Sequence, residues 1–236
     1  MPDKFDIEFD SNTLVSATLY RATRERLGVT LILAHGAGSN QNSSFLVSFA
    51  NNLAARGVDT VTFNFPYMER GKRVPDPPEK LEACYGAAIA RVLTNSHLRS
   101  NKLAIGGKSL GGRIASHVAA SDDQTAASIA ALIFLGYPLH PPGKPQQQRV
   151  KHLPHIRVPM LFVQGSRDAF GTPKELEPII KQLDAEATLY VVENGDHSLT
   201  VPKKWPVPQE KVFEAVQDRI ADWLRKRLTT GTSGSA

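Results

Sequence analysis

The sequence predicts an α/β fold, in which a mostly parallel, eight-stranded sheet carries helices on both faces. Short apolar runs rich in β-branched residues recur along the 236 residues, and helix-length amphipathic segments separate them. This alternation is typical of a parallel sheet covered on both sides. Most of the runs are continuously apolar, as strands buried on both faces are. The composition, 41% hydrophobic and 22% charged, is that of a globular protein.

The length predicts one domain, because α/β domains of about 200–250 residues around a single core are common. We expect this domain to span residues 1–228. Residues 229–236, with the sequence TTGTSGSA, have no apolar periodicity, and their Thr, Ser and Gly content predicts a disordered tail.

The predicted sheet begins with an antiparallel hairpin, formed by strands at 4–9 and 14–20 that Asp10-Ser11-Asn12 connects. From there on strands and helices alternate. The six further strands are predicted at 29–34, 58–63, 102–106, 129–135, 159–164 and 187–192. Apolar residues at helical spacing predict four helices, around Phe45 to Leu53, Leu81 to Val92, Leu110 to Val118 and Val212 to Trp223.

Two connections are long and rich in proline, at 64–79 and 137–157. Long loops in a compact domain are frequently functional. The second is too short for a large helical cap domain, so we expect an open site. Both loops are expected to line a shallow acyl pocket, the first through Phe65, Tyr67 and Met68.

The strongest chemical signal is Gly107-Lys108-Ser109-Leu110-Gly111, a G-x-S-x-G motif between a predicted strand and an amphipathic helix. This is the context of a nucleophile elbow, in which a serine stands on a sharp turn. The turn needs neighbours without bulk, and glycine meets that need. The alternative is a glycine-rich turn whose serine only caps the helix.

A serine hydroxyl becomes nucleophilic when a base takes its proton and a carboxylate orients that base. Asp168 and His197 each follow a later predicted strand, where open α/β sheets place their sites. The chain order Ser, Asp, His also matches that of known nucleophile elbows. Glu193 and Asp196 are alternative acids, although Asp196 adjoins His197 and adjacent side chains usually diverge.

An oxyanion needs two donors, one after the nucleophile and one in the loop after an early strand. The strand at 29–34 ends in His35-Gly36-Ala37-Gly38. The backbone N–H groups of Ala37 and Leu110 are therefore the predicted oxyanion hole. The alternative for this turn is a tight strand exit without a chemical role.

Other classes of function find no support in the sequence. A Walker A loop ending at Ser109 would need glycine where Lys102 stands, and a dinucleotide fingerprint beginning at Gly36 would need a small residue in place of Gln41. We expect no metal site, since metal-ligand spacings are absent. The net charge of +5 comes from 28 basic residues interleaved with 23 acidic ones, so we expect a solvated surface and no nucleic-acid partner.

We also expect no membrane partner, because no secretory leader or membrane-spanning apolar run is evident. One cysteine, Cys84, cannot form an internal disulfide, and a cytoplasmic location fits that. Cys84 occupies an apolar helix position, which favours a place in the core over a role as nucleophile.

The chain resembles the α/β-hydrolase superfamily, and within it the small dienelactone-hydrolase-related branch, which includes a testis-expressed protein and a subunit of the chromatin NSL acetyltransferase complex. The matching segments are His35-Gly36-Ala37-Gly38, Gly106 to Arg113, Tyr137-Pro138-Leu139-His140, Leu161 to Asp168 and Asp196-His197-Ser198. The resemblance implies Ser109, Asp168 and His197 as a catalytic triad and no cofactor. Dienelactone hydrolases proper carry a cysteine nucleophile, and this chain has Ser109 in its place.

These inferences together predict a serine hydrolase that cleaves carboxylic esters or thioesters of small to medium acyl groups through an acyl-enzyme. Its partner is then a small-molecule ester. We expect His35, Phe65, Tyr67 and His140 to contact that substrate. The alternative function is a hydrolase-like scaffold for protein interaction with little or no turnover.

Overall fold

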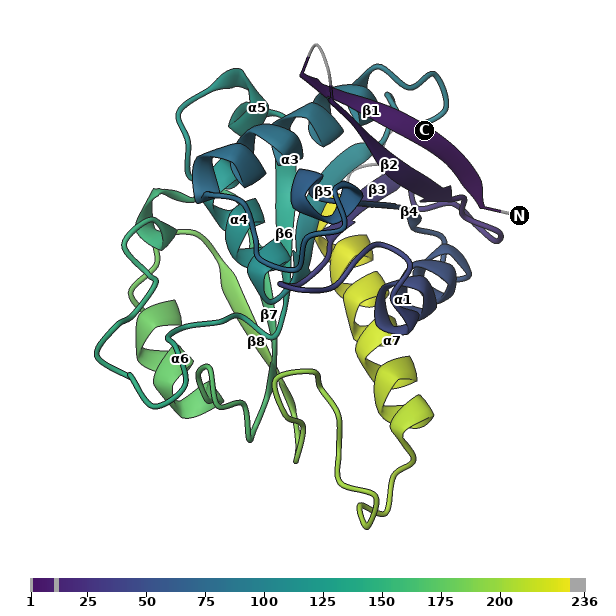
Figure 1. Ribbon diagram of the computed structural model, residues 1–236. Coiled ribbons are helices and arrows are strands. Elements are labelled where there is room, and N and C mark those ends of the chain that lie inside the picture. Colours follow the sequence, from purple (N-terminus) through teal and green to yellow (C-terminus); the bar gives the residue numbers. More distant parts are fainter. Residues whose placement is uncertain (1, 11–12, 230–236) are drawn as a thin grey trace.

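One mixed sheet runs through the computed structural model, which describes residues 2–10 and 13–229 (Figure 1). The strand order is β1-β2-β4-β3-β5-β6-β7-β8. Two neighbouring pairs, β1–β2 and β2–β4, are antiparallel and the other five are parallel, so the predicted fold class is confirmed. The strands are β1 (Asp3–Asp10), β2 (Thr13–Tyr20), β3 (Val29–Ala34), β4 (Asp59–Phe63), β5 (Lys102–Lys108), β6 (Ile129–Leu135), β7 (Met160–Gly165) and β8 (Ala187–Val192).

The eight strands lie within two residues of their predicted ends, because apolar β-branched runs bounded by turn residues leave little freedom of placement. The largest difference is at β5, which continues to Lys108, directly before the serine of the motif. Two predictions fall outside the described residues: the hairpin turn at 11–12, and the tail at 229–236 except for Thr229. The single domain over 1–228 stays a prediction.

Each central strand contributes side chains to two apolar cores, one on either face of the sheet. In β3, Leu31 and Leu33 belong to one core and Ile32 and Ala34 to the other, since successive side chains of a strand point to opposite faces. All six residues of β3 are buried. This explains why most of the central strands are nearly continuous apolar runs instead of alternating.

Helices cover both faces, as the alternation predicts. Packed against the Leu31 face are α1 (Ser44–Ala54) and α7 (Gln209–Leu228), which run side by side in Figure 1. The Ile32 face carries α3 (Pro78–Leu93), α4 (Leu110–Ala119) and α6 (Pro173–Ile180). Three short pieces complete the structure: α2 (Pro66–Glu69), α5 (Gln124–Ala127) and a 3₁₀ turn at Leu153–His155.

Helix α6 is not among the four helices that the sequence predicts. It has eight residues, contains Pro178 and buries only Leu176, so it offers too few apolar positions for a helical period. Its start has a clear local signal, because Thr172 and Glu175 form a capping box. That signal could have revealed the helix.

The carboxyl edge of the sheet carries no cap domain in the described residues. The connection between β6 and β7 contains only the 3₁₀ turn, as expected from its length. The loops after β3, β5, β7 and β8 therefore meet at an uncovered edge, where α/β sheets place their sites. None of the described helices is both long enough and apolar enough to cross a membrane.

Candidate active site

Ser109 stands at the turn between β5 and α4 in a strained conformation. Its φ of 49° and ψ of −113° lie in a region that residues with side chains rarely adopt, and such strain is concentrated at functional sites. A Cβ atom on Gly107 or on Gly111 would lie 2.4 Å from the carbonyl oxygen of Ala34. Only glycine at both positions lets the turn pack against the end of β3 and present the serine hydroxyl.

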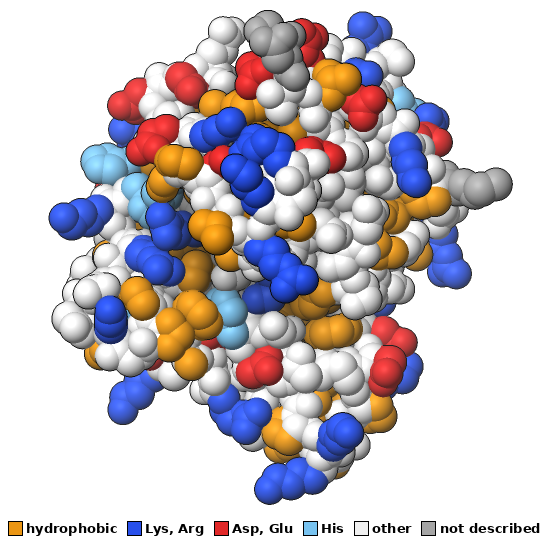
Figure 2. All heavy atoms as spheres, in the orientation of Figure 1, with side chains coloured by type: hydrophobic (Ala, Val, Ile, Leu, Met, Phe, Trp, Pro, Cys, Tyr) orange, Lys and Arg blue, Asp and Glu red, His pale blue; other side chains and the backbone are white. Residues whose placement is uncertain are grey.

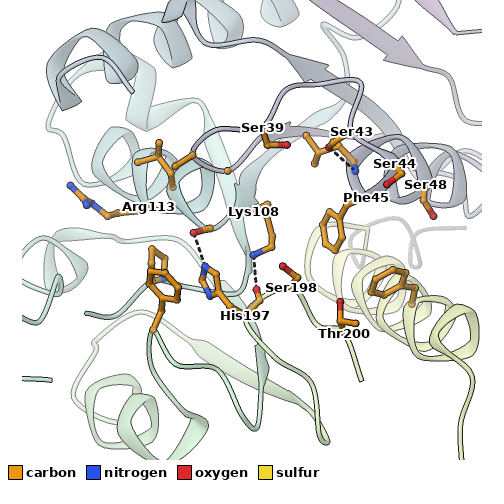
Figure 3. A pocket seen from close by; sticks show the side chains of 18 of the residues that line it. Ser39, Ser43, Ser44, Phe45, Ser48, Lys108, Arg113, His197, Ser198 and Thr200 are labelled. Carbon is orange, nitrogen blue, oxygen red and sulfur yellow. Dashed lines mark hydrogen bonds between the residues drawn. The ribbon is translucent and has the colours of Figure 1, made fainter. Parts of the chain in front are cut away.

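A continuous chain of hydrogen bonds joins Ser109, His197 and Asp168. Nε2 of His197 lies 2.8 Å from Oγ of Ser109 (Figure 3), and Nδ1 lies 2.9 and 2.8 Å from the two carboxylate oxygens of Asp168. This geometry allows Nδ1–H to donate to the carboxylate while Nε2 accepts the hydroxyl proton. Three residues that the sequence analysis selected from separate loops therefore meet at one point.

The Asp168 carboxylate is buried and accepts two further hydrogen bonds. It is 1% exposed and accepts hydrogen bonds from the side-chain amide of Gln164 and from the N–H of Phe170, each 2.8 Å long. Gln164 is itself fully buried and is fixed through Tyr137 and Gly171. Gln164 is thus a positioning residue for the carboxylate, because its own amide cannot turn without breaking buried hydrogen bonds.

His197 is also fixed from two directions. Its ring stacks on Phe170, with centroids 4.0 Å apart and planes 26° apart. Its carbonyl oxygen accepts a 2.5 Å hydrogen bond from Nζ of Lys108 (Figure 3). The loop is tight on both sides, since Asn194 and Leu199 have φ values of 56° and 60°.

Neither of the two alternative acids contacts the His197 ring. Asp196 accepts hydrogen bonds from the N–H groups of Ser198 and Thr200 and so shapes the turn after His197. Glu193 is exposed. Within the described residues, the His197 ring makes its carboxylate contacts with Asp168 alone.

Lys108, the variable residue before the serine, points into the cavity beside the hydrogen-bonded chain (Figure 3). Burial lowers the pKa of Lys108 to about 8, while the charges of Asp168 and Asp196 act in the opposite direction. A cation is therefore kept close to His197 at neutral pH.

The turn after β3 lies against the elbow. A Cβ atom on Gly36 would lie 3.5 Å from the carbonyl oxygen of Lys108 and 3.7 Å from Cβ of Ser109. Ala37 and Leu110 both line the cavity that holds Ser109. The N–H of Leu110 is in the first turn of α4, where amides have no acceptor within the helix, and no described residue accepts the N–H of Ala37.

His35, Phe65 and Tyr67 lie beneath this turn, and the expectation that they contact substrate is wrong. All three are 0% exposed, and none lines the cavity. Nδ1 of His35 donates to the carbonyl of Gly36, 2.8 Å away, and Nε2 accepts the N–H of Phe65 at 3.1 Å. Burial lowers the pKa of His35 to about 4, so the imidazole is neutral, as these two bonds require. These side chains support the turn from the core.

His140 is likewise outside the cavity, contrary to expectation. It is 5% exposed, and its Nε2 lies 3.2 Å from a carboxylate oxygen of Glu175 on α6. Its position reflects the folding of the β6–β7 loop back onto α6. The two long loops do reach the cavity, but through Pro75, Pro138 and Arg149.

The cavity has a volume of about 870 Å³ and extends to both sides of Ser109. In Figure 3, Arg113 lies on one side of His197, while Phe45, Ser48 and Thr200 lie on the other. Phe45 and Phe213, from α1 and α7, contact each other edge to face with centroids 5.5 Å apart. The helical spacing of Phe45 predicts only packing, and Phe213 is not one of the apolar positions that predict the last helix, so the sequence does not reveal their place in the cavity wall.

Metal and thiol chemistry find no site in the part of the chain that the structure describes. No group of three or more His, Cys, Asp or Glu residues there could hold a metal ion. Cys84 is buried, and burial raises the pKa of its thiol to about 12, which disfavours the thiolate.

Several solved structures share this fold. Dienelactone hydrolase from Anabaena variabilis ATCC 29413 superimposes with a TM-score of 0.72 at 20% identity, over 96% of this chain and 99% of that one. XC6422 from Xanthomonas campestris, described as an α/β serine hydrolase without lid, gives a TM-score of 0.74 at 16% identity, over 100% and 97%. Est1E from Butyrivibrio proteoclasticus gives 0.67 at 17% identity, over 94% and 98%.

A curated relative is the quorum-quenching protein AidA of Acinetobacter baumannii (strain MDR-ZJ06), 33% identical over 134 residues. The match spans 55% of this chain and 43% of that protein, less than half of its length. The profile of the family described as "Alpha/beta hydrolase domain" matches residues 28–225, a range that contains Ser109, Asp168 and His197. The chain therefore belongs to the α/β hydrolase domain family.

Proposed function

We propose that this chain is a serine hydrolase that cleaves carboxylic esters or thioesters of small to medium acyl groups through an acyl-enzyme. The observation that carries the proposal is the unbroken hydrogen-bond chain from Oγ of Ser109 through His197 to the buried carboxylate of Asp168. A serine on a strained turn, next to a histidine that a carboxylate orients, is the arrangement that activates a hydroxyl.

In the acylation step, Oγ of Ser109 attacks the ester carbonyl carbon while Nε2 of His197 takes the hydroxyl proton. The carbonyl π electrons move to the oxygen, and the N–H groups of Ala37 and Leu110 donate to that oxyanion. When the intermediate collapses, the bond to the leaving group breaks and His197 returns its proton to the departing oxygen or sulfur. Asp168 stabilises the imidazolium throughout.

In the deacylation step, a water molecule takes the place of the leaving group. His197 accepts a proton from that water, the resulting nucleophile attacks the acyl carbon, and the acyl bond to Ser109 breaks as His197 returns the proton to Oγ. The products are the free acid and the regenerated enzyme.

The cavity supports substrates of moderate size. About 870 Å³ lies in the upper part of the range of about 300–1,000 Å³ that small-molecule sites occupy. The absence of a cap domain among the described residues leaves the carboxyl edge accessible from outside.

A cytoplasmic location, which we infer from the single cysteine, is part of the same proposal.

The proposal is tested with a fluorophosphonate probe and intact-mass measurement of the wild type and Ser109→Ala. A single adduct on the wild type and none on the variant supports an activated Ser109. A panel of esters and thioesters of increasing acyl length then measures the substrate class. Absence of an adduct on folded wild-type protein would overturn the proposal in favour of the scaffold function.

A further inference from the structure

One end of the cavity is lined by two phenylalanine rings that the proposed mechanism does not use. They are Phe45 in the first turn of α1 and Phe213 on α7. We infer that the ester substrate carries an uncharged aromatic group, which binds against these two rings. This inference rests on the proposed function and names the substrate class of the same site.

Three phenylalanine rings pack together where α1 meets α7. Phe45 stacks on Phe49, with centroids 4.4 Å apart and planes 20° apart. The ring of Phe213 contacts both of them edge to face, with centroids 5.5 Å from each. Phe49 is fully buried, whereas Phe45 and Phe213 are only partly buried and line the cavity. The cluster therefore presents aromatic surface to a ligand in the cavity.

This surface lies in an open hollow. Figure 2 shows hydrophobic side chains at the surface of the hollow on this face of the molecule. Apolar side chains gathered in a concave site are typical of ligand-binding pockets. Any apolar group gains from burial there, and an aromatic group gains further from stacked or edge-to-face contact with the phenylalanine rings.

The ammonium of Lys108 adds a second preference for an aromatic group. Figure 3 places Lys108 between His197 and Phe45, and all three side chains line the cavity. No Asp or Glu among the described residues lines that cavity. The face of an aromatic ring attracts a cation, and an aliphatic chain does not. A ring that extends from Ser109 towards Phe45 is therefore favoured by Lys108 as well.

Neutral hydroxyl groups surround the two rings. Figure 3 shows Ser44, Ser48 and Thr200 at the end of the cavity that contains Phe45. An aromatic ring has a negative face and a positive edge, so its edge C–H groups suit the oxygens of these hydroxyls. A carboxylate here would lie against apolar rings, which do not replace its hydration. This end of the cavity therefore favours an aromatic group without charge.

The test compares phenyl and cyclohexyl members of two ester pairs. Methyl 3-phenylpropanoate and methyl 3-cyclohexylpropanoate carry the ring in the acyl group, and 2-phenylethyl acetate and 2-cyclohexylethyl acetate carry it in the leaving group. In all four, saturated carbons separate the ring from the ester, so the ring does not conjugate with the reacting bond. Cyclohexyl has the larger apolar surface, so burial alone favours cyclohexyl, whereas contacts with the rings and with Lys108 favour phenyl.

We expect the wild type to favour the phenyl member of one pair by about threefold or more in kcat/KM, with acid release followed in a pH-stat. Phe45→Leu and Phe213→Leu keep an apolar side chain and remove the aromatic ring, and each should at least halve the phenyl-to-cyclohexyl ratio. The matched control is Phe9→Leu, since Phe9 is partly buried on β1 and lies outside the cavity lining, and it should keep the wild-type ratio. Circular dichroism and Tm verify that each variant is folded, and if one is not, the other decides.

A binding measurement separates this inference from the proposed function. Calorimetric titration of Ser109→Ala with the four esters requires no turnover. Tighter binding of the phenyl member of one pair, lost when Phe213→Leu is added, supports the aromatic site even if no ester is cleaved. Equal or weaker binding of the phenyl member in both pairs, or a preference that survives both phenylalanine changes, overturns it. In that case, fluorophosphonate labelling of Ser109 still decides the proposed function by itself.

Discussion

Replacing Lys108 by Met should change how the stability of the protein depends on pH. Lys108 is held close to His197 by the hydrogen bond from its Nζ to the His197 carbonyl oxygen, and burial lowers its pKa from 10.5 to about 8. In the unfolded chain the ammonium keeps its proton up to about pH 10.4. Between these two values the unfolded state binds more protons than the folded state, so the free energy of unfolding rises with pH.

The size of this effect follows from the pKa shift. At about 1.4 kcal/mol for each pH unit, a fall from 10.5 to about 8 corresponds to about 3 kcal/mol. The ammonium borders the open cavity, so screening by solvent makes this an upper figure. The hydrogen bond to His197 contributes little to the pH dependence, because a neutral amine also donates to a carbonyl. Methionine has a similar shape and does not titrate.

The assay is urea unfolding of the wild type and Lys108→Met at several pH values from 7 to 10. The free energy of unfolding of the wild type, minus that of the variant, should increase by up to about 3 kcal/mol over this range. Lys102→Met is the matched control, since Lys102 is exposed at the start of the same strand. Parallel pH profiles for the wild type and Lys108→Met would refute the reasoning.

Three further changes test the site. Asp168→Asn should lower kcat about 10⁴-fold with little change in KM, because the asparagine NH₂ can donate to Nδ1 and favours the His197 tautomer whose Nε2 cannot accept the serine proton. Steady-state kinetics check this, and near-normal kcat would move the orienting role to another group. Gly111→Ala should lower the free energy of unfolding, measured in urea, by more than about 2 kcal/mol, because the new Cβ would lie 2.4 Å from the carbonyl oxygen of Ala34. A stable, active variant would show that the turn can open. The pKa of His35 is lowered to about 4. The stability that its neutral form contributes should therefore be lost as the pH falls from about 6.5 towards 4. In NMR, the ring signal of His35 should titrate near pH 4 instead of pH 6.5.

The predicted sheet and elbow depend on features that are local in the sequence. An apolar run of β-branched residues forms a buried strand in any α/β arrangement, and the close approach of the elbow to Ala34 admits only glycine at 107 and 111. Asp168 and His197 could be selected because loops after successive parallel strands meet at one edge of the sheet. These inferences need the order of elements but no details of side-chain packing.

The contacts that support the site could not be predicted in the same way. Gln164 and Lys108 are ordinary polar residues at strand ends, and their roles appear only when the loops bearing Asp168 and His197 pack against them. The capping box at Thr172 is a local signal that the spacing of apolar residues does not capture, which explains why α6 was missed.

The sequence by itself determined the strand order along the chain, the turn that carries Ser109, and the order of Ser109, Asp168 and His197, because backbone sterics and apolar periodicity act over short distances. Only the tertiary structure decided which side chains face the cavity. His35 and Phe65 entered the core, while Arg113 and Arg149 came together at the cavity wall. The physical reason is that the burial of a loop side chain depends on the surfaces that distant segments offer to it, and residues at a loop do not specify those surfaces.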